Sequence, residues 1–348
     1  LGLGVIAALV GTLALPLVLA AFPDAGESVR EQAGAYLSVI LPSLPLLLVA
    51  SMMAAVHQAA GDTRTPLFVA IAANVVNAGA NWVLIFGELG APALGARGAA
   101  IGSVLALAVE CVVLGALLWR GRGAISMRGR GGERAQLRRM TKVALPAVLE
   151  RVFQHAGFLV YVGLIGALGP LAMAANQTLI GIEAIAFLSA DGFGIAAASI
   201  VAQRLGAGRP DDAARAAKAA LAMGVAALSS CGVVFLLAPR LLASAFSPDA
   251  DIVEAVVPCL AVAAVAQPFM ACAVVLGETL RGAGATRATL VITMIGGLVV
   301  RLGATWLFAF ELELGLIGVW LGSTVDWMVR TALVAVLFVR GGWARTVV

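Results

Sequence analysis

Charged residues are scarce in this sequence. Only 12% of its 348 residues are Asp, Glu, Lys or Arg, and 61% are hydrophobic, whereas a soluble domain carries about 25% charged residues. So few polar side chains cannot cover a water-facing surface, which excludes a soluble enzyme and a disordered chain. The four cysteines all lie in apolar runs, which excludes a disulfide framework and a cysteine metal site: Cys111, Cys231, Cys259 and Cys272.

Lysine and histidine are also rare. Lys142 and Lys218 are the only lysines, and neither belongs to a Gly-x-x-x-x-Gly-Lys-Ser/Thr loop, which argues against ATP hydrolysis. The chain has neither a His/Cys cluster nor a nucleophile elbow, so we expect no enzymatic activity and no cofactor. Catalysis by the purified chain without any ion gradient would contradict this expectation.

Long apolar runs are what the sequence does contain. A helix needs about 20 apolar residues to cross a bilayer, and alternating strand patterns are absent, so we predict an all-α polytopic membrane protein. Ten runs meet the requirement: 1–22, 35–57, 66–87, 98–119, 143–168, 177–202, 213–238, 252–276, 288–310 and 316–339.

The basic residues fall on one side of these spans. Seventeen of the 23 Lys and Arg residues lie in alternate connections and in the C-terminal tail, three lie in the other connections and three within spans. Because basic loops stay in the cytoplasm, the bias predicts a cytoplasmic C-terminus. The Arg-rich stretch 120–142 lacks interleaved aromatic residues, so we interpret it as a basic cytoplasmic linker and expect no nucleic-acid partner.

The two sides of this linker resemble each other. Gly61–Leu67 aligns with Gly284–Leu290, and Leu94–Ser103 aligns with Leu314–Ser323. Matched segments fall on the same side of the membrane, which is typical of transporters built from parallel repeats. We predict an N-terminal lobe over residues 1–119 with four helices and a C-terminal lobe over 143–348 with six. The offset implies that two helices precede the first span of a twelve-helix, two-lobe fold.

Several of these motifs resemble one family, the multidrug and toxic compound extrusion (MATE) transporters. The resemblance rests on motifs spread in order along the chain: Gly61–Leu67, Asn77–Gly87, Leu94–Ile101, Leu145-Pro146 with Glu150, Ala174–Gln177, Gln203–Gly208 and Leu280–Gly284. It implies two helical bundles around a central cavity, and export of drugs driven by entry of H⁺ or Na⁺. Asn81 stands where proton-linked members tend to show Asp, and Gln267 and Met270 occupy the region where sodium-linked members tend to place a carboxylate. The coupling ion therefore stays open.

Carboxylates inside the spans are the candidates for cation coupling, because a charge at the bilayer centre costs at least about 2.5–3.5 kcal/mol and usually faces a cavity or a partner. Glu150 lies one turn after Pro146, whose missing N–H can open the backbone. The alternatives for Glu150 are a structural pair with Arg151 and a position close to the cytoplasmic interface. Glu183 and Asp191, eight residues apart, are expected to line one groove, although interhelical hydrogen bonding is the alternative.

Uncharged polar residues extend this pattern. Asn74, Asn77 and Asn81 recur on one helical face, Gln154 follows Glu150 at i+4, and Gln177 lies near the outer end of its span. We expect these five to line a cavity, with hydrogen bonding between helices as the alternative.

Two further patterns predict structural contacts. Arg301, Asp326 and Arg330 are expected to form a buried charge cluster, with a structural role favoured over transport. The pairs Gly98/Gly102 and Gly318/Gly322 are both GxxxG motifs, for which we expect close helix packing within the chain and a monomeric protein.

The function that this sequence favours is secondary active antiport by alternating access of two lobes. Cationic or amphipathic drugs would leave while H⁺ or Na⁺ enters, across a bacterial inner membrane. One alternative is a flippase for lipid-linked precursors, which should show a strongly cationic cavity. The other is a membrane partner without transport activity.

Overall fold

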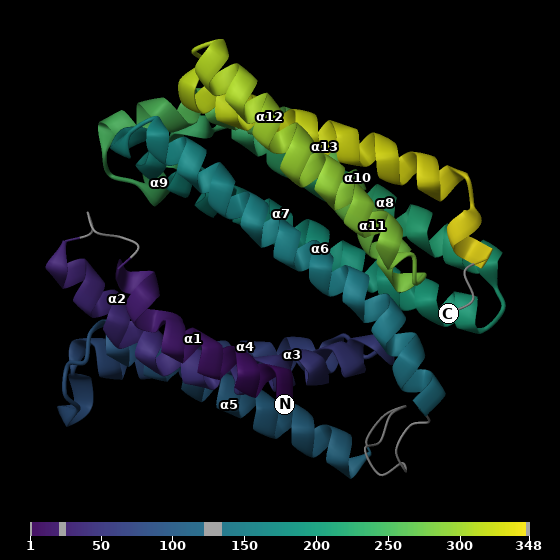
Figure 1. Cartoon of the computed structure of the whole chain (residues 1–348), viewed down its shortest axis with the longest axis horizontal. Coiled ribbons are helices and arrows are strands. Elements are labelled where there is room, and N and C mark those ends of the chain that lie inside the picture. Colours follow the sequence, from purple (N-terminus) through teal and green to yellow (C-terminus); the bar gives the residue numbers. More distant parts are fainter. Residues whose placement is uncertain (1, 21–25, 122–133, 346–348) are drawn as a thin grey trace. The chain divides into compact units, whose positions relative to one another are not determined.

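The computed structural model describes residues 2–20, 26–121 and 134–345, and within these ranges every regular element is helical (Figure 1). Ten helices there are long and apolar enough to cross a membrane, which confirms the predicted class of a multi-pass α-helical membrane protein. Backbone contacts divide the chain into two units, residues 1–131 and 132–348. All four cysteines are free, as expected.

Unit 1 contains the first four spans. Its helices are α1 (Gly2–Ala20), α2 (Glu27–Ile40), α3 (Leu44–Ala59), α4 (Arg64–Phe86) and α5 (Ala96–Arg120), with short 3₁₀ turns at Leu41–Ser43 and Glu88–Gly90. Helices α2 and α3 form one span, Glu27–Ala59, with the first 3₁₀ turn between them. Pro42 and Pro45 lack a backbone N–H, which interrupts regular α-helical hydrogen bonding at this turn. Helix α5 packs against α2, α3 and α4.

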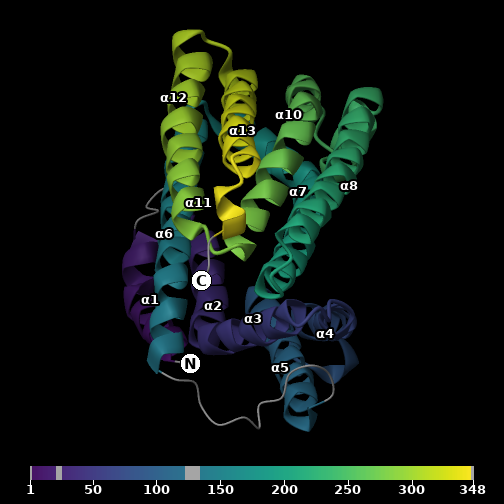
Figure 2. The same cartoon turned by 90° about the vertical axis from the view of Figure 1, so that its right-hand side faces the viewer.

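Unit 2 contains six spans. It comprises α6 (Arg134–Ala167), α7 (Pro170–Gly206), α8 (Pro210–Leu237), α9 (Pro239–Phe246), α10 (Ala250–Gly282), α11 (Thr286–Thr293), α12 (Arg301–Trp306), α13 (Gly315–Val339) and a 3₁₀ turn at Gly342–Arg345. The π-helical segment Met294–Val300 joins α11 and α12, and a second one, Leu307–Glu311, follows α12, so that Thr286–Glu311 forms one span. Helix α10 packs against α7, α8 and α13 (Figure 2). In its most apolar stretch of 18 residues, 67% of the residues are buried.

Helix α6 differs from its predicted form in two respects. It begins at Arg134, so the stretch 134–142 is helical although we predicted a linker over 120–142, of which residues 122–133 lie outside the described part. It also continues through Pro146 without a break, so the expected opening of the backbone beside Glu150 does not occur.

The GxxxG motifs pack within the chain, as predicted. A Cβ on Gly318 would lie 2.5 Å from Ala309 N, and one on Gly322 would lie 2.6 Å from Thr305 N. Gly98 meets the backbone of α4 at Leu84 in the same way. Only a residue without a side chain permits these approaches, which bring backbones together where lipid provides no hydrophobic drive for helix association.

Candidate functional site

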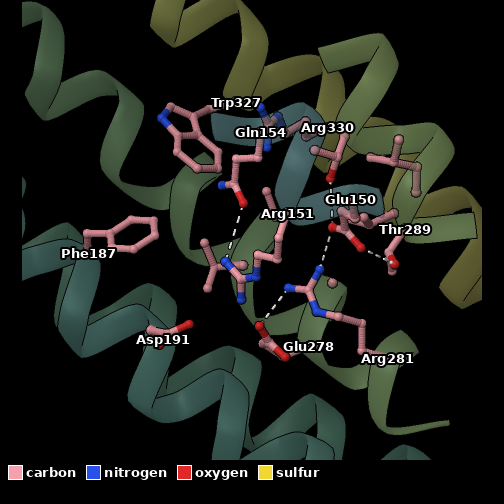
Figure 3. A pocket seen from close by; sticks show the side chains of 16 residues that line it. Glu150, Arg151, Gln154, Phe187, Asp191, Glu278, Arg281, Thr289, Trp327 and Arg330 are labelled. Atoms are coloured by element: carbon pink, nitrogen blue, oxygen red, sulfur yellow. Dashed lines mark hydrogen bonds and ion pairs between the residues drawn. The ribbon is translucent and has the colours of Figure 1, made fainter. Parts of the chain in front are cut away.

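Glu150 is a buried carboxylate of unit 2 that accepts three hydrogen bonds. Its side chain is only 6% exposed. Oε1 accepts hydrogen bonds from Arg281 Nη1 at 2.7 Å and Thr293 Oγ1 at 2.8 Å, and Oε2 accepts one from Thr289 Oγ1 at 2.8 Å (Figure 3). The carboxylate is therefore paired with Arg281. The alternative prediction from the sequence, a pair with Arg151, is not what the structure shows.

Three helices converge on this carboxylate. Glu150 comes from α6, Arg281 from the last turn of α10, and Thr289 and Thr293 from α11. The two threonines are four residues apart and so share one face of their helix. Arg281 also donates from Nη2 to Glu278 Oε1 at 2.6 Å, so one guanidinium group serves two carboxylates and links α6 to α10.

A small pocket surrounds this group. Asp191 and Phe187 of α7 line it, and no hydrogen bond or ion pair joins Asp191 to the other side chains drawn in Figure 3. We refer to this cavity as the carboxylate pocket.

Three carboxylates and three guanidinium groups line the carboxylate pocket. Arg281 is shared by Glu150 and Glu278, Arg330 pairs with Asp326, and Arg151 donates to the uncharged Gln154 Oε1 at 3.3 Å. Asp191 makes no ion pair within the described part of the chain, so its carboxylate is a group that a proton or a monovalent cation can neutralise.

A second and larger pocket adjoins the first. Its empty volume is about 1370 Å³, and residues of α6, α7, α12 and α13 line it together with Gly297. We refer to it as the aromatic pocket, because aromatic side chains form much of its wall: Phe158, Tyr161, Phe187, Trp320 and Trp327. The two pockets share Arg151, Gln154, Phe187, Trp327 and Arg330.

The structure brings the predicted charge cluster together beside the aromatic pocket. Asp326 is fully buried, and its carboxylate accepts from Arg301 Nε at 2.8 Å and from Arg330 Nε at 2.6 Å. The guanidinium of Arg301 also lies over the rings of Tyr161 and Trp327, with 5.6 and 5.4 Å to the ring centroids.

A glycine in the first π-helical segment makes room for this cluster. A Cβ on Gly296 would overlap Asp326 Oδ1 and lie 2.5 Å from Arg330 Cγ. The close approach of the Thr286–Glu311 span to α13 therefore depends on the absence of a side chain here.

Glu183 and Asp191 line two adjoining pockets that share five residues, so their position on one groove stays a prediction. Asp191 lines the carboxylate pocket, whereas Glu183 lines the aromatic pocket. Gln154 lines both, in agreement with its predicted position. Gln177 is exposed and lines neither, while its neighbour Asn176 is the buried residue of that turn.

The asparagine stripe of unit 1 is mostly occupied with hydrogen bonds between and within helices. Asn77 Nδ2 donates to Ser103 Oγ of α5 at 3.4 Å, and Asn81 Nδ2 donates to Asn77 Oδ1 at 3.0 Å. Asn74 is exposed and donates to the Ala70 carbonyl of its own helix. This pattern favours the alternative that the stripe holds helices together.

Four residues of this site were not predicted from the sequence: Glu278, Arg281, Thr289 and Thr293. Arg281 was counted with the cytoplasmic charges because it ends an apolar run, although it lies in the last turn of α10. The i,i+3 spacing of Glu278 and Arg281 could have predicted that these two side chains form an ion pair. No sequence pattern indicated a role for Thr289 and Thr293, since Thr is common in membrane helices.

Comparisons with known proteins agree with the fold. The MatE family model matches residues 1–83 and 146–307. The chain is 26% identical to a probable multidrug resistance protein NorM from Thermotoga maritima, covering 94% of this chain and 71% of that protein. It is 30% identical to a protein of the same name from Brucella suis, covering 81% of this chain and 61% of the relative. The solved structure of an outward-facing multidrug resistance MATE family transporter superposes with a TM-score of 0.82 at 19% identity, over 98% of this chain and 78% of that one.

Proposed function

The chain belongs to the MATE family of transporters, and on this basis we propose that it acts as a secondary active antiporter for cationic or amphipathic drugs. H⁺ or Na⁺ entering the cell drives export by alternating access. The relatives named above are described as multidrug resistance proteins, which supports a drug substrate. The multi-pass helical architecture supports residence in the plasma membrane, and the distribution of basic residues supports a cytoplasmic C-terminus.

The observation that carries the proposal is the shared guanidinium of Arg281. While Arg281 serves both Glu150 and Glu278, α6 is tied to α10. A cation that neutralises one of these carboxylates removes its attraction for Arg281 and weakens the tie between the two helices. Cation binding in the carboxylate pocket thereby changes the packing of unit 2, which is what alternating access requires.

The available driving force is sufficient for export. Each elementary charge that moves down a potential of 100 mV supplies about 2.3 kcal/mol. This corresponds to a drug concentration ratio of about 50-fold, because about 1.4 kcal/mol is a factor of ten. This ratio applies to a neutral drug exchanged for one cation; exchange of one cation for one monovalent cationic drug moves no net charge, so the concentration gradient of the coupling cation drives that exchange.

The test is transport in proteoliposomes containing the purified protein. Flux of a fluorescent organic cation is followed under a pH gradient alone, a Na⁺ gradient alone, or neither. We expect flux with one of the two gradients and its loss when that gradient is collapsed. Flux that is equal under all three conditions would contradict antiport. Gradient-independent translocation of a lipid-linked pyrophosphate in the same vesicles would favour the flippase alternative.

A further inference from the structure

Asp191 faces the carboxylate pocket from α7 without an ion-pair partner among the described residues. The charged groups that act on it electrostatically are Glu278, Arg151 and Arg281. Arg281 already serves Glu150 and Glu278. Its guanidinium group is thus shared between two other carboxylates, which leaves Arg151 as the positive group that can compensate Asp191.

Arg151 is the guanidinium group of this pocket that has no carboxylate partner in the described part of the chain. Arg330 pairs with Asp326, whereas Arg151 donates from Nη1 to the uncharged Gln154 Oε1 at 3.3 Å. A hydrogen bond of this length to a neutral acceptor is weaker than one to a carboxylate. Arg151 is also exposed, so its long side chain changes rotamer without disturbing a packed core.

The arrangement of the two side chains allows them to meet. Arg151 belongs to α6 and Asp191 to α7, and both face the carboxylate pocket (Figure 3). The pocket gives the guanidinium group room to turn from Gln154 toward Asp191. A pair formed in this way ties α6 to α7, just as Arg281 ties α6 to α10.

We propose that Arg151 is a tethered competitor of the coupling cation. Without a bound cation it pairs with Asp191 and holds α6 against α7. A proton or Na⁺ that neutralises Asp191 displaces Arg151, which then takes the position at Gln154 seen in the structure. Arg151 thereby acts through Asp191 as a positioning residue, and this role rests on the antiport proposed above.

Two physical requirements favour such a competitor. A carboxylate inside a membrane span is costly when its charge is not compensated, and Arg151 compensates Asp191 in the part of the cycle without a bound cation. A transported cation must also leave its site again, and competition lowers the apparent affinity of a site by the fraction of time for which the site is free. Because a guanidinium group prefers a carboxylate over a neutral acceptor by about ten-fold, we expect Arg151 to weaken cation binding by about that factor.

The first test is a double-mutant cycle of Arg151→Gln and Asp191→Asn, measured by thermal unfolding of the purified full chain in detergent. At alkaline pH with choline in place of Na⁺, we expect Arg151→Gln to unfold about 2–4 °C below the wild type. In the Asp191→Asn background the same substitution should have no effect, because the pair is already lost.

Addition of the coupling cation should remove this dependence. The cycle is repeated at mildly acidic pH and, separately, at alkaline pH with saturating Na⁺. We expect at least one of these conditions to bring the unfolding temperature of Arg151→Gln to that of the wild type, since the cation then occupies Asp191 in both proteins. Additive effects without a cation would overturn the proposal, and so would a coupling that neither cation removes.

The second test measures the competition itself, as the midpoint of the rise in unfolding temperature with cation concentration. Arg151→Gln is expected to lower the H⁺ or Na⁺ concentration at this midpoint by about ten-fold. Arg151→Lys retains a tethered positive charge and should keep the midpoint of the wild type. An unchanged midpoint in Arg151→Gln would refute the competition, and a shift of the same size in Arg151→Lys would show that the tethered charge is not its cause.

Arg240→Gln is the matched control, because Arg240 is exposed and pairs with Glu254 away from the pocket. It should leave the midpoint unchanged. Neither test uses an ion gradient, so the two proposals fail separately. Additive effects together with intact gradient-driven flux refute the role of Arg151 alone, whereas a coupled pair without gradient-driven flux refutes the antiport alone.

Discussion

Replacing Glu150 by Gln separates the charge of this carboxylate from its hydrogen bonds. The amide group can be oriented so that its oxygen replaces Oε1 and its nitrogen replaces Oε2. The oxygen then still accepts from Arg281 and Thr293. The nitrogen can donate to Thr289 Oγ1, because that hydroxyl also bonds the Thr286 carbonyl at 3.0 Å and can donate there alone.

The expected loss of stability is therefore small. A hydrogen bond to a charged group contributes about 1.5–3 kcal/mol and a neutral one about 0.5–1.5 kcal/mol, so the weakened bond from Arg281 loses about 1 kcal/mol. Arg281 keeps its second carboxylate, Glu278. By contrast, Glu150→Ala removes the acceptor that Arg281, Thr289 and Thr293 share, and each group left without a hydrogen bond costs about 1–3 kcal/mol.

Thermal unfolding and transport are measured on the same preparations. We expect Glu150→Gln to unfold roughly 2–4 °C below the wild type and Glu150→Ala to unfold much lower. Because an amide does not titrate or bind a cation strongly, gradient-driven dye flux per inserted protein should fall to the passive leak in Glu150→Gln. Glu254→Gln is the control, since an exposed ion pair contributes at most about 1 kcal/mol.

Two results would refute this reasoning. Undiminished gradient-driven flux in Glu150→Gln would exclude Glu150 from cation coupling. A thermal shift for Glu150→Gln as large as that of Glu150→Ala would show that the amide cannot take over the hydrogen bonds of the carboxylate.

Three further predictions concern stability. Gly318→Ala should lower the unfolding temperature because its Cβ would lie 2.5 Å from backbone atoms, at a cost of about 1–3 kcal/mol. Gly303→Ala is the control: its Cβ would meet nothing within 4 Å, so it should be neutral or stabilising. Equal shifts in unfolding temperature for the two variants would contradict the packing argument. Asp326→Asn removes the one negative charge between two buried guanidinium groups and should cost about 3–5 kcal/mol, seen as a large loss of thermal stability or of folded yield. The hydrogen bonds from Thr65 lower the pKa of Asp62, in the connection after α3, so its contribution is present above the unfolded pKa of about 3.9 and is lost as the pH falls through the folded value. Asp62→Asn should be less stable than the wild type at pH 7, and the difference should shrink as the pH falls below the unfolded pKa of about 3.9. A difference that does not change with pH would refute this.

Charged residues were easier to identify from the sequence than to pair. Arg301, Asp326 and Arg330 were predicted as a cluster because Asp326 and Arg330 share a helical face and all three carry a charge that a bilayer penalises. Glu150 was recognised for the same reason. Its partner Arg281 lies 131 residues further along the chain, and no local spacing connects the two.

The faces of helices were also harder to predict than the helices themselves. Both the core-facing and the lipid-facing sides of a membrane helix are apolar, so hydrophobic periodicity does not say which side is buried. Glu183 and Asp191 lie about 80° apart around α7, and about 12 Å separates them along the axis at 1.5 Å per residue. That distance places them in two different pockets.

The sequence by itself determined that this protein is a multi-pass helical membrane protein of the MATE family. These properties follow from composition, from the length of apolar runs and from local motifs, and each is encoded within a few turns of helix. It also predicts an orientation from the basic loops. Only the tertiary structure decided that Arg281 is shared by two carboxylates, that threonines of α11 complete the site, and that the aromatic pocket lies beside it. The physical reason is that a buried charge must find a partner, whereas the packing of helices distant in the sequence decides which partner it finds.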